Sequence, residues 1–334
     1  AGNSGTSGPG NAGGAGGLIG GGGGGGTISA GSTATGGAGG YGGGGGSPGG
    51  AGGFGAGGGG SGRLSAVPGG PGGFGGGGGS GSSTGTAGGN GGFGAGGGGG
   101  VGTAGTGGIG GGNGTVAPFA GGGGAGFGGA IFSRAGSVLV LGNTTTTSCD
   151  VVAGTGGAPS AAGQDFFGVS NGIDGTLTQL TFNPTSGQTQ SFSGSIGDTS
   201  ANTLSTGDNP GSGAGLLLQK NGAGLLILLG ANTYSGGTNV TAGVLQGNTL
   251  SLQGNITDDT TVIFDEPSTG TPGTYAGVIS GPGTLIKQNI GTTTFTGANT
   301  YTGGTTIDDG TLALSGAGSL DSAGFVSINA GTFD

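Results

Sequence analysis

Three pairs of adjacent acidic residues are the side chains in this sequence that could do chemistry: Asp258–Asp259, Asp265–Glu266 and Asp308–Asp309. Two carboxyl groups can cleave a glycosidic bond, and carboxylate oxygens in a turn can bind Ca²⁺. Neighbouring residues on a strand point to opposite faces, however, so such pairs do not converge on one substrate. We therefore expect no catalytic residue, no metal site and no cofactor, with weak calcium binding at these turns as the alternative.

The rest of the composition also argues against an enzyme. The chain has no His, which excludes Ser-His-Asp and Cys-His arrangements and imidazole acid–base catalysis. The single cysteine, Cys149, cannot form an internal disulfide or a Cys-based zinc site by itself. It is either an incidental buried residue or an intermolecular link. Matches to G-x-G-x-x-G abound in the glycine tracts, but none follows a strand and opens a helix, so we expect no nucleotide site.

The charges are few and their distribution excludes further partners. Only 5% of the 334 residues are charged, and the formal net charge is −9. Residues 1–149 contain only Arg63 and Arg134, and all acidic residues follow from Asp150 onward. Without a basic stripe, nucleic acid is not an expected partner. The longest good apolar run, Leu225–Leu229, is far shorter than the ~20 residues that span a bilayer, so we expect no membrane span in this segment.

Glycine dominates residues 1–129, the first of two regions that we expect. The chain has 109 glycines, and a GG-x-GG-aromatic pattern recurs around Tyr41, Phe54, Phe74 and Phe93. A non-glycine residue at every third position matches a helix with three residues per turn, so packed polyglycine II-type helices are one interpretation. A flexible linker is the other, because ordering glycine has a high entropic cost. The four aromatic residues are the candidate anchors for assembly.

Residues 130–334 form the second expected region and read as all-β. Short β-branched and aromatic runs such as Thr176–Phe182 and Thr292–Thr296 are separated by Gly-Gly, Asn-Gly and Gly-Pro steps. No segment keeps the i, i+3, i+4 spacing of a helix over three turns.

An internal repeat organises this second region. Residues 217–246 align with 284–313 at an offset of 67, so that Asn232 meets Asn299 and Tyr234 meets Tyr301. Rungs of ~20–25 residues would make this offset about three rungs, and roughly nine rungs would fit between 130 and 334. We expect the two Asn side chains to bond corner backbone groups and the two Tyr side chains to point inward.

These residues resemble the autotransporter-associated β-strand repeat, also called the passenger-associated transport repeat. The core L-x-K-x-G-x-G-T-L-x-L-x-G-x-N-T-Y-[ST]-G-G-T is matched from Leu217 and again from Thr284, with Asn289 and Ile290 departing where Gly and a small residue are usual. The resemblance implies a right-handed parallel β-solenoid (β-helix). It also implies a bacterial autotransporter passenger, secreted or displayed on the outer-membrane surface.

Two functions remain open from the sequence. One is an extracellular structural protein that associates with itself into fibres or a surface layer. The other is a monomeric, rod-like adhesin that binds a host, glycan or abiotic surface. The chain opens as a mature N-terminus would and stops within what looks like a repeat, so we expect a piece of a longer protein.

Overall fold

The computed structural model describes most of the chain as two compact units. The described residues are 15–16, 34–62, 66–81, 85–108, 111–116, 120–122, 124, 126–127, 130–133, 137–146, 152, 155, 161–169, 178–198, 215–267 and 271–334. Unit 1 comprises residues 1–127, 151–161 and 204–209, and unit 2 comprises 128–150, 162–203 and 210–334. Cys149 lies outside the described residues.

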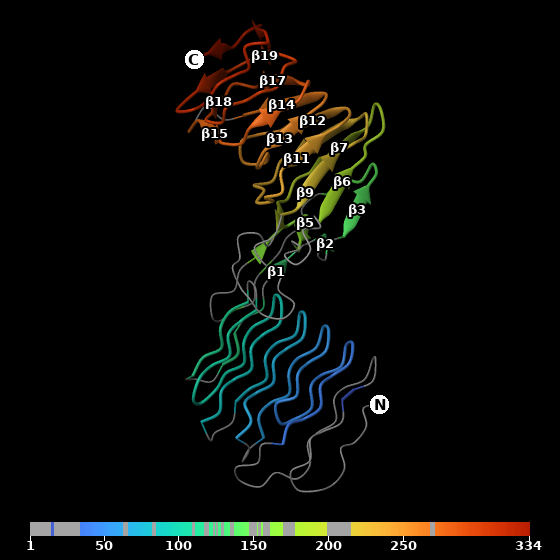
Figure 1. Cartoon of the computed structure of the whole chain (residues 1–334), viewed down its shortest axis with the longest axis vertical. Coiled ribbons are helices and arrows are strands. Elements are labelled where there is room, and N and C mark those ends of the chain that lie inside the picture. Colours follow the sequence, from blue (N-terminus) through green and yellow to red (C-terminus); the bar gives the residue numbers. More distant parts are fainter. Residues whose placement is uncertain are drawn as a thin grey trace. The chain divides into compact units, whose positions relative to one another are not determined.

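Unit 2 is a parallel β-solenoid, in which the chain winds so that each strand pairs with strands one turn away (Figure 1). The largest sheet has seven strands: β7 (Thr189–Phe192), β10 (Leu225–Leu228), β12 (Val244–Gly247), β14 (Thr261–Asp265), β17 (Thr284–Gln288), β19 (Thr305–Ile307) and β21 (Val326–Ile328). The second has six: β3 (Val138–Leu141), β6 (Gln179–Phe182), β9 (Leu217–Lys220), β11 (Thr238–Val240), β13 (Ile256–Asp258) and β16 (Ile279–Ser280).

Shorter sheets complete the strand pairing. A four-stranded sheet contains β15 (Gly273–Tyr275), β18 (Thr292–Phe295), β20 (Thr311–Leu314) and β22 (Thr332–Phe333). A three-stranded sheet contains β2 (Ile131–Ser133), β5 (Phe166–Gly168) and β8 (Ile196–Asp198), and a two-stranded sheet contains β1 (Gly126–Phe127) and β4 (Ala161–Ala162). All of the described residues are strand, turn or irregular, which confirms the all-β prediction.

The expectation of roughly nine rungs is wrong. The longest stack among the described residues has seven strands, and the regular part of the solenoid makes about five turns. The strands of the six-stranded sheet from β9 onward begin at residues 217, 238, 256 and 279, so these turns measure 21, 18 and 23 residues. Turn length therefore varies, and part of residues 130–334 lies between the stacked strands.

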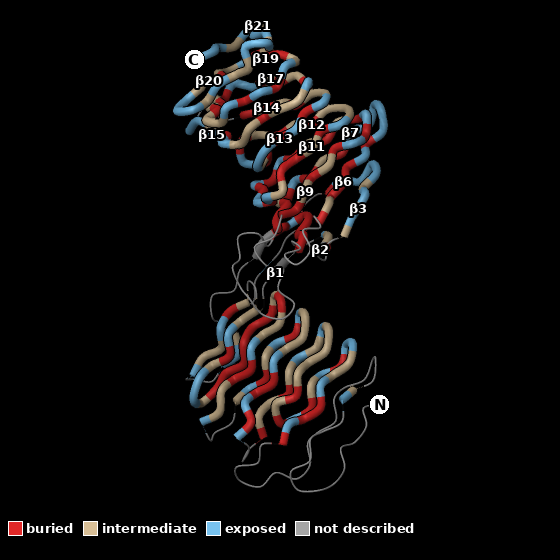
Figure 2. The backbone as a smooth tube through the Cα atoms, viewed as in Figure 1, coloured by how far each residue is buried: buried red, intermediate tan, exposed pale blue. Residues whose placement is uncertain are grey.

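The core of unit 2 lies inside the coil. Strands alternate half-buried and buried side chains, as in β9, β10 and β12, because successive residues point to opposite faces (Figure 2). Each turn adds apolar side chains to the same interior column, such as Leu218 and Leu226. In the first repeat Tyr234 and Leu245 are buried, whereas Val244, which the pattern also allowed inside, is half-buried on the outer side.

The two sequence repeats do not lie above one another. Residues 217–246 form β9 and β11 of the six-stranded sheet with β10 and β12 of the seven-stranded sheet. Residues 284–313 form β17 and β19 of the seven-stranded sheet with β18 and β20 of the four-stranded sheet. The offset of 67 residues is therefore three turns plus one face, and not about three turns.

Unit 1 is built from repeated hairpins without strand ladders of the usual kind. Each turn places an aromatic residue before a glycine of positive φ, as at Tyr41 and Gly42 (φ 70°) or Phe54 and Gly55 (φ 75°). This φ favours glycine because it has no Cβ. In the first such hairpin, the N–H of Gly46 donates to the carbonyl of Gly37 across the two arms at 2.9 Å.

Neighbouring hairpins are joined by hydrogen bonds at every third residue. The N–H groups of Gly36, Gly39, Gly42 and Gly45 donate to carbonyls twelve residues ahead, at 2.6–3.0 Å. The arms lie side by side in Figure 1. The backbones are so close that a Cβ on Gly53 would lie 1.7 Å from the carbonyl oxygen of Gly40, which explains why glycine fills these positions.

Candidate functional site

The four aromatic residues predicted as anchors form a continuous ladder. The ring centroids of Tyr41 and Phe54 lie 4.9 Å apart, those of Phe54 and Phe74 5.0 Å, and those of Phe74 and Phe93 4.8 Å, with interplanar angles of 4° or less. This spacing is close to that of hydrogen-bonded neighbouring chains, so backbone pairing sets the stack. Phe93 is buried, whereas Tyr41 is 60% exposed, so one end of the ladder is open to contacts.

Asn232 and Asn299 each bridge successive turns of the solenoid. The Asn232 Oδ1 accepts the N–H of Ile196 at 2.7 Å, and its Nδ2 donates to the carbonyl of Ser251 at 2.6 Å. Asn299 does the same with Ile279 at 2.9 Å and Ser319 at 3.1 Å. Both side chains are buried. Each amide thus pairs backbone groups that the corner would otherwise leave unsatisfied inside the protein.

Tyr234 and Tyr301 are the buried partners of these corners. Each hydroxyl bonds the Thr four residues later, Tyr234 to Thr238 at 2.9 Å and Tyr301 to Thr305. Burial raises the pKa of Tyr301 to about 12 and also raises the pKa of Tyr234. Neither phenol ionises near neutral pH, so both act here as packing and hydrogen-bonding groups.

Two buried lysines, which the sequence marked only as matching positions, form a further pair. Lys220 and Lys287 are fully buried. The ammonium group of Lys220 donates to the carbonyls of Gly222 and Ala242, the latter at 2.7 Å. Burial lowers the pKa of Lys220 to about 8 and lowers that of Lys287. The alignment of the two lysines was the available signal for this site, but their burial was not readable from polarity.

The acidic pairs lie apart from one another in their contacts. Asp258 is fully buried while Asp259 is exposed, as expected for neighbours at the end of a strand. Asp265 accepts hydrogen bonds from Gln246 and Asn289, and buried Glu266 accepts two from Thr249. Across the described residues, no three Cys, Asp or Glu side chains come together as a metal site would require.

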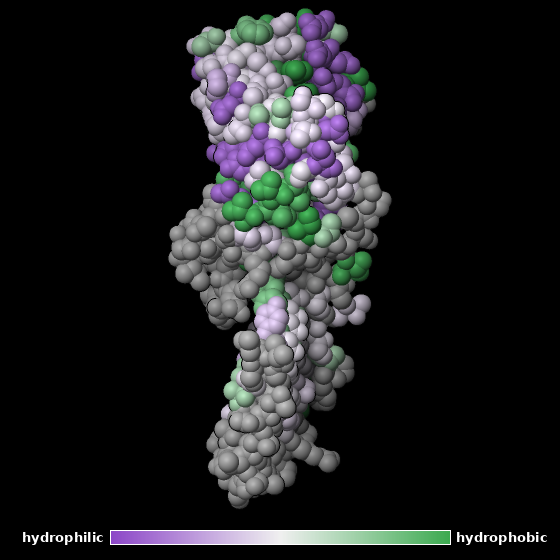
Figure 3. Space-filling view, turned by 90° about the vertical axis from the view of Figure 1, so that its right-hand side faces the viewer, coloured by the Kyte–Doolittle hydropathy of each residue, from purple (hydrophilic) through white to green (hydrophobic). Residues whose placement is uncertain are grey.

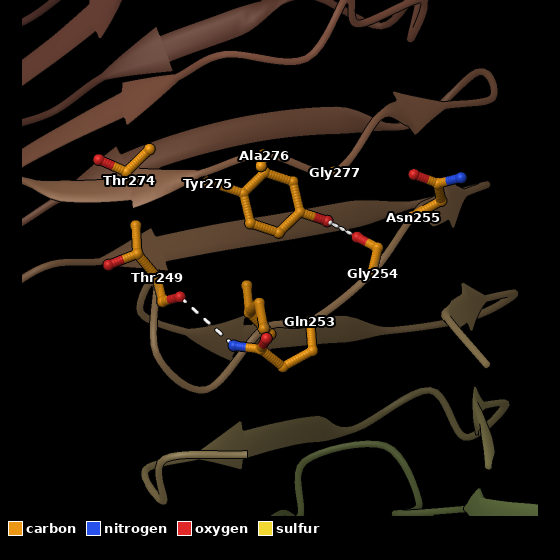
Figure 4. Close-up of a pocket in the computed structure, with 9 residues that line it drawn as sticks. Thr249, Gln253, Gly254, Asn255, Thr274, Tyr275, Ala276 and Gly277 are labelled. Carbon is orange, nitrogen blue, oxygen red and sulfur yellow. Dashed lines mark hydrogen bonds between the residues drawn. The ribbon is translucent and has the colours of Figure 1, made fainter. Parts of the chain in front are cut away.

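A hollow of about 400 Å³ opens beside β15, and sequence reasoning missed it (Figure 4). We call it the β15 hollow. It is lined by residues of the β12–β13 loop and by the outer edge of β15: Thr249, Leu252, Gln253, Gly254, Asn255, Thr274, Tyr275, Ala276 and Gly277. It exists because β15 is the first strand of its sheet, so the preceding turn offers a loop and not a pairing strand. No charged side chain lines it.

The surface of the solenoid is mostly polar on the face drawn in Figure 3, with one hydrophobic patch. The patch lies at the height of β3 in Figure 1, and Val138 and Val140 of this edge strand are 61% and 58% exposed. Among the residues that the structure describes, no helix is long and apolar enough to cross a membrane.

Comparison with known proteins addresses the repeats. No curated protein and no solved structure matches the chain. The family model of the passenger-associated-transport-repeat matches residues 218–246 and 285–314, which are the two segments that run from β9 to β12 and from β17 to β20. The chain therefore carries two passenger-associated-transport-repeats within a parallel β-solenoid, in agreement with the resemblance seen in its sequence.

Proposed function

We propose that this chain is a non-enzymatic passenger segment of a bacterial protein, secreted or held at the outer-membrane surface, whose copies associate with one another. The two passenger-associated-transport-repeats support an extracellular location. The buried hydrogen-bond partners of the Asn, Tyr and Lys side chains support a scaffold and not a reaction centre. In this proposal the solenoid coils right-handedly and serves as the stiff part of the protein.

The aromatic ladder carries the proposal of self-association. Its rings repeat at 4.8–5.0 Å, and the hydrogen bonds of unit 1 repeat at every third residue. These two periods support packed polyglycine II-type helices in unit 1. An array of this kind gives a second copy a regular surface of backbone groups and ring edges, and the exposed Tyr41 is the side chain available to that copy.

Electron microscopy of the purified chain across a concentration series tests the proposal. We expect filaments or sheets that disappear when Tyr41, Phe54, Phe74 and Phe93 are all changed to Ser. Tyr41→Ser alone should raise the concentration at which assemblies form, while Tyr41→Phe keeps the ring and should leave it unchanged. Dispersed single rods at every concentration, with circular dichroism showing a folded chain, would contradict self-association.

An adhesin is the second candidate function, and the β15 hollow is the observation that favours it. Saturable binding of the dispersed chain to a defined surface, without assembly, would support this function.

A further inference from the structure

The edge of β15 that faces the hollow has free backbone groups. The N–H of Thr296 donates to the carbonyl of Tyr275 at 3.0 Å, so Gly273 and Tyr275 direct their backbone groups toward β18. In a parallel ladder the alternate residues then direct theirs the other way. Thr274 and Ala276 therefore present N–H and C=O groups to the hollow, and neither has a backbone partner there among the described residues.

Side chains add further free polar atoms around the same space. The Gln253 Nε2 donates to the carbonyl of Leu250 at 2.8 Å, while its Oε1 has no hydrogen bond within the described structure. The Thr274 hydroxyl is exposed and likewise has no bonded neighbour among the described residues. At the rim, the Asn255 Oδ1 accepts the N–H of Val278 at 3.0 Å, which leaves its amide N–H groups to donate. Donors and acceptors therefore alternate around the opening.

The electrostatics of the hollow select for an uncharged ligand. The nearest acid to its wall is Glu266, which is buried and accepts bonds from the Thr249 N–H at 3.2 Å and hydroxyl at 2.9 Å. The floor is apolar, formed by buried Leu252 and Tyr275. An ion would lose its hydration here without gaining an opposite charge. A neutral molecule with both a hydroxyl-rich rim and an apolar face would match both surfaces.

The shape of the hollow selects for a compact ring. One end is closed, because the Tyr275 hydroxyl donates to the carbonyl of Gly254 at 2.6 Å (Figure 4). Gly277 packs against the same carbonyl so closely that a Cβ there would lie 2.0 Å from its oxygen. An added β-strand would have to continue past this closure, so strand addition does not fit. The volume of about 400 Å³ is at the small end of ligand sites, which span roughly 300–1,000 Å³.

We propose that the β15 hollow binds one neutral sugar residue of a glycan. Gln253, Thr274 and the free backbone groups of β15 would bond its hydroxyls, while Leu252 and the Tyr275 ring would contact its apolar face. This inference deepens the adhesin alternative and does not depend on self-association, because no residue of the aromatic ladder takes part.

Saturation-transfer NMR on the whole chain tests this site. The probes are the methyl glycosides of glucose, galactose and mannose, free N-acetylglucosamine, and glucuronic acid as the charged comparison. We expect at least one neutral probe to receive saturation, with glucuronic acid receiving less. Thr274→Val and Gln253→Met should each reduce the transfer at least about fivefold, since each removes hydrogen-bonding atoms at nearly constant shape. Ala276→Val, which narrows the opening without removing any bond, should reduce it as well.

Thr294→Val is the matched control. Thr294 pairs with Thr274 on the adjacent strand but does not line the hollow, so its transfer should equal that of the unchanged chain. The proposal is overturned if no neutral probe receives saturation at roughly 50 mM, where even weak binding by a small ring is detectable. It is also overturned if the three hollow variants, folded by circular dichroism, keep full transfer or if glucuronic acid is preferred. Electron microscopy of the same samples reports on self-association separately.

Discussion

Lys220 and Lys287 occupy the same place in the two repeats and make the same buried contacts, although their strands belong to different sheets. Lys220 ends β9 of the six-stranded sheet, and Lys287 lies in β17 of the seven-stranded sheet. Each ammonium group donates to two successive corners: Gly222 and Ala242 for the first, Asn289 and Asp309 for the second. The repeat therefore specifies a corner with its buried cation and not a particular face of the solenoid.

Replacing either lysine by Met should destabilise the solenoid. Met keeps the apolar stem but removes the donor, so the corner carbonyls lose their partner inside the protein. We expect Lys220→Met and Lys287→Met each to lower the free energy of unfolding by about 1–3 kcal/mol, less than a full charge effect because the desolvation of the ammonium group is also relieved. Urea unfolding measures the change. Equal stability of both variants and the unchanged chain would show that these hydrogen bonds contribute nothing net.

The glycines above the two ammonium groups should tolerate no side chain. Gly243 has a φ of 73° and Gly310 a φ of 68°, and a Cβ on either would lie 2.4 Å from a carbonyl oxygen and 2.7–2.8 Å from the lysine Nζ. Gly243→Ala and Gly310→Ala should therefore cost about 3 kcal/mol or more, which combines the left-handed backbone with the clash.

Gly316→Ala separates these two causes. Gly316 has a φ of 63°, but a Cβ there would meet nothing within 4 Å. Backbone strain alone should cost roughly 1–2 kcal/mol. If urea unfolding gives the same loss for Gly316→Ala as for Gly243→Ala, the close contact with the lysine corner is not what requires glycine.

The bridging amide of Asn232 should contribute more than its exposed counterpart. Asn232→Ala leaves the Ile196 N–H and the Ser251 carbonyl without partners in the interior, so we expect a loss of about 2–4 kcal/mol. Asn255→Ala removes one bond at an exposed position and should cost about 1 kcal/mol or less. Thermal unfolding of both variants gives the comparison. A smaller loss for Asn232→Ala than for Asn255→Ala would contradict the bridging role.

The sequence predicts the winding of unit 2 better than its geometry. Strand residues bounded by Gly and Asn, together with two aligned copies of a long motif, suffice for a parallel solenoid. The number of turns and the face that each repeat occupies do not follow, because the turns measure 18 to 23 residues and small differences accumulate along the coil. Asn289 shows the same limit locally. Its φ of 65° explains why glycine is usual there, but only the backbone reveals that angle.

The site residues divide in the same way. The aromatic ladder of unit 1 is visible in sequence as a recurring spacing, since one aromatic residue per hairpin must stack when hairpins pair in register. The β15 hollow has no such signal. It arises where a loop replaces a strand on one face, which depends on the pairing of β15 with β18 on its other side. A search for polar residues would not separate Gln253 and Thr274 from the many other amides and hydroxyls of this chain.

Asp258 should make the solenoid more stable as the solution becomes mildly acidic. The side chain is fully buried, its Oδ1 accepts the N–H of Thr260 at 2.9 Å, and its Oδ2 has no partner among the described residues. Burial raises the pKa of Asp258 from 3.8 to about 6, against the lowering effect of the Thr260 bond and with a small raising effect of Asp259. The folded state therefore binds a proton more tightly than the unfolded state between these two values.

It follows that the contribution of Asp258 to the free energy of unfolding rises as the pH falls from about 7 to about 4. Asp258→Asn should abolish this dependence and stabilise the chain at pH 7 by about 1–3 kcal/mol, since the amide needs no charge in the interior. Urea unfolding at several pH values between 4 and 7.5 tests this, with the difference between the unchanged chain and Asp258→Asn removing the effect of other carboxyls. Exposed Asp259 provides the control, because Asp259→Asn should shift the curve little. Parallel curves for the unchanged chain and Asp258→Asn would mean that Asp258 titrates alike in both states, and that solvent reaches its free oxygen.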